Sequence, residues 1–156
     1  MREADLPAIH ALQCTAYPPD YHEPEAALAS HLAAGPQTSF VAEGESRLLA
    51  YVFAHPWQGE PPRLHEALPE RNQADHLFVH DLAVSPEARG RGAAALLVQA
   101  VRETASAQRI EEIRLVALAH AITFWRRHGF EELPAFPLPA CYGDACLMRQ
   151  SPQPKI

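Results

Sequence analysis

Apolar positions change their spacing along the chain, and each spacing predicts a different element. Helical spacing in the first part of the chain predicts two helices, over residues 4–17 and 24–35. Two apolar runs follow, over residues 39–44 and 47–55, and Gly44-Glu45-Ser46 between them is typical of a hairpin turn. The first third of the chain therefore predicts two helices followed by an antiparallel strand pair.

The centre of the chain predicts a strand–helix–strand unit. Residues 76–84 are apolar on both faces, which is typical of a central strand, and residues 92–108 carry an amphipathic helical pattern. A second strand is predicted over 111–118, a short helix over 120–129 and a last strand over 140–148. This order indicates a mixed α/β domain.

A long polar segment interrupts this pattern. Residues 56–75 contain four prolines and many charges, which predicts a surface excursion with one helical turn near Leu64–Leu68. The length of 156 residues suits one compact domain. We assign residues 1–150 to that domain and 151–156 to a C-terminal tail.

Composition narrows the classes of function. The formal net charge is −6, which makes nucleic acid a poor partner and leaves an acidic surface that tolerates cationic small molecules. No apolar run approaches the roughly 18 residues that span a membrane, and no secretory signal pattern opens the chain, so we expect a cytoplasmic protein without membrane contact. Three cysteines without zinc-like spacing, Cys14, Cys141 and Cys146, are expected to be free thiols.

The stretch SPEARGRGAAALL, residues 85–97, predicts a turn that holds an anion. It lies between a strand and a helix, and the first amides of a helix have no internal acceptor and sit at the positive end of its dipole. Gly90 and Gly92 allow successive N–H groups to converge on a phosphate, and Arg89 and Arg91 add positive charge. On these residues alone, a tight turn that needs glycine only for its shape is an equal alternative.

Two motifs separated along the chain favour the phosphate interpretation. Arg89-x-x-Gly92-x-Ala94 and Phe124-Trp125-x-x-x-Gly129-Phe130 resemble the two core motifs of the GNAT N-acetyltransferase superfamily, and the resemblance is strongest over residues 76–133. It implies a mixed, mostly antiparallel sheet with a central pair of splayed parallel strands, flanked by about four helices. The stretch around His80 further resembles the serotonin N-acetyltransferase type of this superfamily.

The resemblance implies acetyl-CoA as co-substrate and direct transfer of its acetyl group to a primary amine of a small molecule. The pantetheine arm would pair with the backbone of Leu82, Ala83 and Val84 as an added strand. Phe124 and Trp125 would flank the thioester. The pyrophosphate would lie on the turn formed by Arg89, Gly90, Arg91, Gly92, Ala93 and Ala94.

Two residues are candidates for proton transfer. His80 is the candidate base, because relatives place Glu or His there; a core or surface histidine is the alternative. The usual acid of the family is a tyrosine at the position of Trp125, and an indole cannot replace it. Tyr142, expected on the last strand, is the candidate acid, with a core aromatic as its alternative. Strand alternation places Asp81 on the opposite face from His80, and we expect it to act as a hydrogen-bonding residue and not as the base.

Other interpretations stay open at this point. A non-catalytic acyl-CoA-binding domain and an acetyltransferase for protein N-termini or lysines would carry the same motifs. We expect no metal, because His76 and His80 share a strand face without a third ligand at suggestive spacing. Only a few residues precede the first helix, so a first strand there would be short and would leave a sheet edge open for a homodimer.

Overall fold

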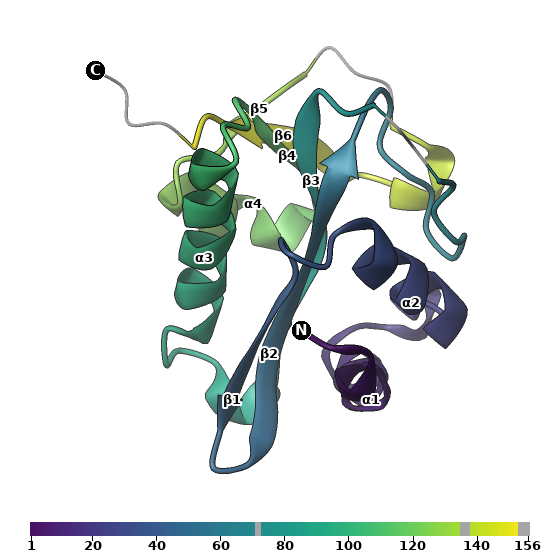
Figure 1. Ribbon diagram of the computed structural model, residues 1–156, viewed down its shortest axis with the longest axis vertical. Coiled ribbons are helices and arrows are strands. Elements are labelled where there is room, and N and C mark those ends of the chain that lie inside the picture. The colour runs from purple at the N-terminus through teal and green to yellow at the C-terminus, as the bar shows by residue number, and fades with distance from the viewer. Residues whose placement is uncertain (71–72, 135–137, 153–156) are drawn as a thin grey trace.

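A computed structural model describes residues 1–70, 73–134 and 138–152, and its framework is one six-stranded sheet (Figure 1). The strand order is β1-β2-β3-β4-β6-β5, in which β3 and β4 are parallel and every other neighbouring pair is antiparallel. This confirms the mixed sheet with a central parallel pair. The strands are β1 (Phe40–Gly44), β2 (Arg47–Trp57), β3 (His76–Val84), β4 (Ile113–Ala117), β5 (Glu131–Glu132) and β6 (Cys146–Gln150).

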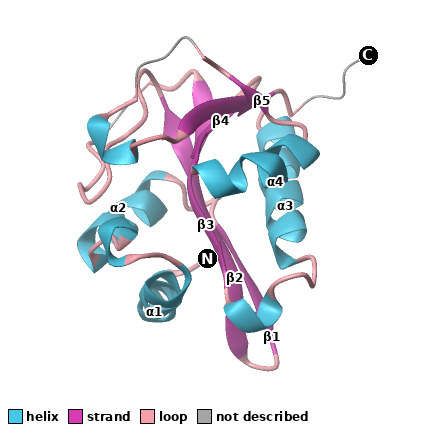
Figure 2. Ribbon diagram, turned by 180° about the vertical axis from the view of Figure 1, so that it is seen from behind, coloured by secondary structure: helices cyan, strands magenta, loops and turns pink. Residues whose placement is uncertain are grey.

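Four α-helices cover the two faces of the sheet, as expected. Both views show α1 (Leu6–Ala16) and α2 (Glu25–Ala34) on one face, and α3 (Ala93–Ala107) and α4 (Ile122–Arg127) on the other (Figures 1 and 2). Each face has its own apolar cluster. Tyr51 and Phe53 of β2 pack toward α1 and α2, whereas the alternate residues of β2 pack toward α3 and α4.

The two parallel strands separate along their length. β3 and β4 are paired from Leu77 opposite Ile113 to Val79 opposite Leu115, and the pairing then stops. Beyond this point β3 stays paired with β2 as far as Val84. The edge of β3 that faces β4 is therefore open from His80 onward, as expected for a splayed pair.

A bulge in β3 lies where the strands begin to separate. Phe53 of β2 pairs with Asp81 and Ala54 pairs with Val79, so His80 is one extra residue in the ladder. The ring of His80 lies 3.8 Å from that of His31 on α2, measured between centroids, and Asp81 accepts a hydrogen bond from Gln13 on α1. Both side chains thus point to the helical layer of α1 and α2, and the expected opposite orientation of Asp81 is wrong.

Two local predictions also require correction. The last strand begins at Cys146, and Tyr142 belongs instead to a preceding 3-10 turn, Ala140–Tyr142. Residues 64–65 form a turn and no helix. The described residues contain no strand before α1, where a 3-10 turn at Glu3–Asp5 lies instead, and this agrees with the expectation that any strand there would be short.

The expected C-terminal tail is described only in part. Residues 153–156 of the expected tail lie outside the described residues. Among the residues that the structure describes, no helix is both long enough and apolar enough to cross a membrane.

Candidate active site

A cavity of about 440 Å³ occupies the space between the separating strands β3 and β4. Several of the residues expected to contact the cofactor or substrate line it: His80, Leu82, Ala83, Val84, Arg89, Ala94, Phe124, Trp125 and Tyr142. The cavity also has lining residues that the sequence did not indicate, among them Gln13, Tyr17, Tyr21 and Glu23. The structure therefore brings the two sequence motifs and the N-terminal helical layer to one cavity.

The turn before α3 lies at one end of this cavity. Gly90 and Gly92 have φ angles of 74° and 83°, a left-handed conformation that favours glycine, and Gly92 is the N-cap of α3. A methyl group added at either position would meet nothing within 4 Å, so backbone conformation alone requires these glycines. The side chains of Arg89 and Arg91 are exposed and form no ion pair with any described residue. The turn thus combines the start of a helix with two arginines that form no ion pair with a described residue, which is the combination expected of a phosphate site.

The second motif forms the wall of the cavity beside β4. Trp125 is buried and packs edge-on against Phe130, with ring centroids 5.1 Å apart. Phe124 is half-buried and lines the cavity as well, and its ring centroid lies 5.0 Å from that of Trp125. Their packing makes this wall apolar.

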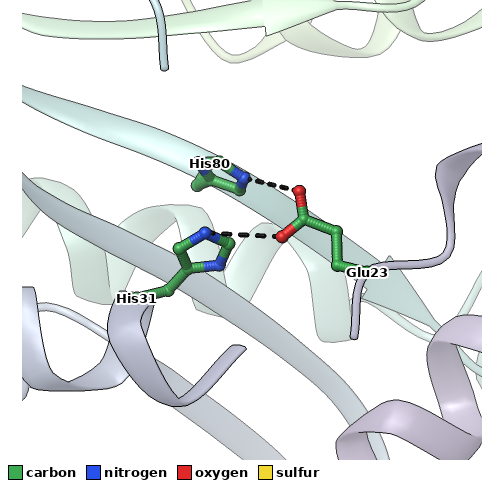
Figure 3. A group of neighbouring side chains, drawn as sticks. All are labelled: Glu23, His31 and His80. Carbon is green, nitrogen blue, oxygen red and sulfur yellow. Dashed lines mark hydrogen bonds and ion pairs between the residues drawn. The ribbon is translucent and has the colours of Figure 1, made fainter. Parts of the chain in front are cut away.

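Buried carboxylate and imidazole groups occupy the other end of the site (Figure 3). Glu23, in the segment before α2, turns its carboxylate toward both His80 of β3 and His31 of α2, whose rings lie next to each other. Nε2 of His80 lies 3.1 Å from Glu23 Oε1, and Nε2 of His31 lies 3.4 Å from Glu23 Oε2. The backbone N–H of Glu23 donates to Gln13 Oε1 at 2.6 Å, which holds this segment against α1.

Burial controls the charge of this cluster. The side chains of His80 and Glu23 are 1% and 3% exposed, and that of His31 is fully buried. Loss of solvent lowers the pKa of His80 to about 3 and that of His31 to about 2, so both rings are neutral at pH 7. Burial also raises the pKa of Glu23, and the nearby imidazole of His31 opposes this rise.

A second carboxylate, the half-buried Asp81, lies on the same face of β3 as His80. It accepts hydrogen bonds from the hydroxyl of Tyr51 and from Gln13 Nε2, the latter at 3.0 Å. Burial raises the pKa of Asp81, and the hydrogen bonds from Tyr51 and Gln13 oppose that rise. Tyr17 lies beside it and donates to the Leu82 carbonyl at 2.6 Å. The expectation that Asp81 acts as a hydrogen-bonding residue is therefore confirmed.

Tyr142 reaches the cavity from the 3-10 turn before β6. Its hydroxyl donates to the carbonyl oxygen of Pro62 at 2.7 Å, and burial raises its pKa. This bond ties the long segment after β2 to the end of the chain. Residues of that segment also donate to Glu23 and Ser30, so the segment is fixed against the acidic end of the site.

Sequence reasoning missed Glu23, His31 and Tyr17. Glu23 and His80 are 57 residues apart, and Glu23 stands outside any periodic element, so no local pattern connects them. The one available signal was a cluster of ionisable residues ahead of the second helix.

Comparison with known proteins agrees with this geometry. The sequence model of the acetyltransferase (GNAT) family matches residues 6–130, and the chain belongs to this family. No curated protein matches the chain in sequence.

Solved structures share the fold at low sequence identity. A GNAT-like decarboxylase, GphF, in complex with isobutyryl-CoA has a TM-score of 0.78 and 18% identity, covering 98% of this chain and 97% of its own. The ribosomal-protein-S18-alanine N-acetyltransferase from Escherichia coli has a TM-score of 0.74 and 17% identity, and the match covers 99% of this chain and 92% of that protein. The PaiA N-acetyltransferase from Thermoplasma acidophilum, in complex with coenzyme A, has a TM-score of 0.73 and 13% identity, and the match covers 97% of this chain and 95% of that protein.

Proposed function

We propose that this protein is an acetyl-CoA-dependent N-acetyltransferase whose acceptor is the primary amine of a small molecule. One observation carries the proposal. A single cavity extends from the turn before α3, past the open edge of β3, to the carboxylates of Glu23 and Asp81. These three parts match the diphosphate, the pantetheine arm and the amine that such a reaction brings together.

The donor would lie along the first two parts of the cavity. The amides from Arg89 to Ala94 and the two unpaired arginines would bind its phosphates. The open edge of β3 at Leu82–Val84 offers backbone N–H and C=O groups to the amides of the pantetheine arm. Phe124 and Trp125 would exclude water beside the thioester. Coenzyme A complexes of proteins with this fold support this arrangement.

The acidic end of the cavity favours a cationic small molecule. Glu23 and Asp81 provide negative charge, and Tyr17 and Tyr21 provide aromatic surface that attracts an ammonium group. The segment after β2 is held to this end of the site by the hydrogen bonds of Tyr142 to Pro62 and of His65 to Glu23, and we infer that it narrows the approach of a peptide chain. These features favour a small amine over a protein N-terminus or lysine.

The reaction would be a direct transfer. The neutral amine attacks the acetyl carbonyl, a C–N bond forms, the C–S bond breaks, and coenzyme A leaves as its thiolate. The His80–Glu23 pair would take the proton lost by the amine, because the carboxylate stabilises the imidazolium as it forms. Tyr142 would protonate the thiolate.

Two measurements test the proposal. Isothermal titration should show acetyl-CoA binding, and a panel of primary amines should release free coenzyme A with at least one small amine. Absence of binding at millimolar acetyl-CoA would overturn the proposal. Binding without turnover on any amine would favour a non-catalytic acyl-CoA-binding domain. Turnover confined to peptides would favour a protein acetyltransferase.

A further inference from the structure

We propose that Glu23, His31 and His80 form a binding site for one Zn²⁺ ion at the inner end of the cavity (Figure 3). Each residue offers one ligand atom, and the three atoms lie within 4.8 Å of one another. Two imidazoles and one carboxylate are a donor set that Zn²⁺ prefers, and the set is found in sites that keep a fourth position for water or substrate.

Each imidazole lies from its nearer Glu23 oxygen at close to the spacing of two ligands on a tetrahedral ion. A Zn²⁺ ion lies about 2.0–2.1 Å from nitrogen and oxygen ligands, so tetrahedral ligand atoms are roughly 3.3–3.4 Å apart. The Nε2 atoms of His80 and His31 lie 3.1 and 3.4 Å from the two oxygens of Glu23. Both rings direct Nε2 toward the same carboxylate, as Figure 3 shows. Small side-chain adjustments would bring the ligand atoms around one ion.

The cluster has polar atoms that a cation would satisfy. Neither ring nitrogen of His31 forms a hydrogen bond with any described residue, and Oε2 of Glu23 forms none either. His31 is completely buried. The lowered pKa values of His31 and His80 keep both rings neutral, which is the form that ligates a metal. A divalent cation would also compensate the buried charge of Glu23.

The ligand atoms of the cluster favour Zn²⁺, a metal between hard and soft in its ligand preference, and the cavity gives the ion a path to them. Glu23 and His80 line the cavity, so an ion can arrive from that side and keep one position open toward it. The nitrogen ligands select Zn²⁺ over Mg²⁺, which prefers an all-oxygen set. His55 lies behind the cluster, with its ring centroid 5.7 Å from that of His80 and 6.0 Å from that of His31.

Metal binding would compete with the proposed acetyl transfer. Zn²⁺ on Nε2 of His80 would separate that ring from the Glu23 carboxylate and remove the proton-accepting pair. We therefore expect Zn²⁺ to inhibit turnover. This inhibition depends on the proposed function, whereas the binding of the metal does not.

The decisive experiment measures Zn²⁺ binding to the metal-free full-length chain, without acetyl-CoA, by competition with a chromophoric chelator. We expect one ion per chain. His31→Gln and Glu23→Gln, each shown to be folded by circular dichroism, should weaken this binding by at least the 10–100-fold that loss of supporting residues causes in metal sites. Mg²⁺ should not compete.

The controls exclude binding at the surface. His10 and Cys14 form an exposed pair, with Nε2 and Sγ 3.9 Å apart, that also suits Zn²⁺, and His10→Gln should leave the measured affinity unchanged. Co²⁺ in the wild-type protein should give a tetrahedral spectrum without a thiolate band, which tests the site without any variant. Absence of Zn²⁺ binding, a thiolate band, or wild-type affinity in folded His31→Gln would overturn the proposal.

Discussion

Replacing Gly92 with alanine tests whether the turn before α3 is shaped for a phosphate. Gly92 has φ 83° and ψ 0°, and an added methyl group would meet no atom within 4 Å. The cost of the substitution is therefore conformational and not steric, at about 1–2 kcal/mol for an L-residue in the left-handed region. In a chain of this length that lowers Tm by roughly 2–8 °C.

The same substitution should weaken the binding of coenzyme A. The strain of alanine at position 92 favours a shift of the backbone toward negative φ, and we expect this shift to displace the first amides of α3. Loss of one hydrogen bond to a charged group costs about 1.5–3 kcal/mol. The expected increase in Kd, measured by isothermal titration with coenzyme A, is roughly 10–100-fold.

Gly59→Ala is a matched control for this experiment. Gly59 has φ 87°, an added methyl group there also meets nothing within 4 Å, and it does not line the cavity. It should lower Tm by a similar amount and leave the Kd for coenzyme A unchanged. If Gly92→Ala lowers Tm but binds coenzyme A like the wild type, the glycine serves only the shape of the turn. An unchanged Tm in both variants would refute the strain argument itself.

Three further substitutions, together with one control, test other parts of the site. Arg89→Ala should weaken acetyl-CoA binding and reduce its salt dependence, because Arg89 forms no ion pair with a described residue. Arg47→Ala is the control: it breaks a 2.9 Å surface ion pair with Glu87 and should not alter the affinity for acetyl-CoA. Equal affinities of the two variants would contradict the assignment of Arg89 to phosphate binding. Tyr142→Phe removes the 2.7 Å hydrogen bond to Pro62 and should cost about 0.5–1.5 kcal/mol in urea unfolding. Because Tyr142 is the proposed acid, the same substitution should also lower kcat. An unchanged kcat would leave Tyr142 only the role of holding the segment after β2. His80→Gln should lower kcat by about 10²–10⁴-fold at unchanged acetyl-CoA affinity, whereas near-wild-type turnover would assign the base elsewhere.

Local patterns in the sequence were sufficient to predict most elements and one end of the site. The strand over 76–84 has the predicted bounds, and α3 differs from its predicted range by one residue at each end. The turn around Gly90 and Gly92 was also predictable, because its glycines stand close together in the motif. Side-chain periodicity and the left-handed tolerance of glycine act over a few residues, so they are visible in the chain itself.

The acidic end of the site depends on contacts that no local pattern encodes. One extra residue in β3 turns His80 and Asp81 to the same face, and strand alternation predicts the opposite. Tyr142 lies in a turn because its hydroxyl binds Pro62, 80 residues earlier in the chain, although its neighbours have a strand-like composition. Glu23 joins His31 and His80 only when α2 packs on the sheet. Burial then shifts the pKa values of all three groups, because removal from water penalises every charged form, and burial exists only in the folded protein.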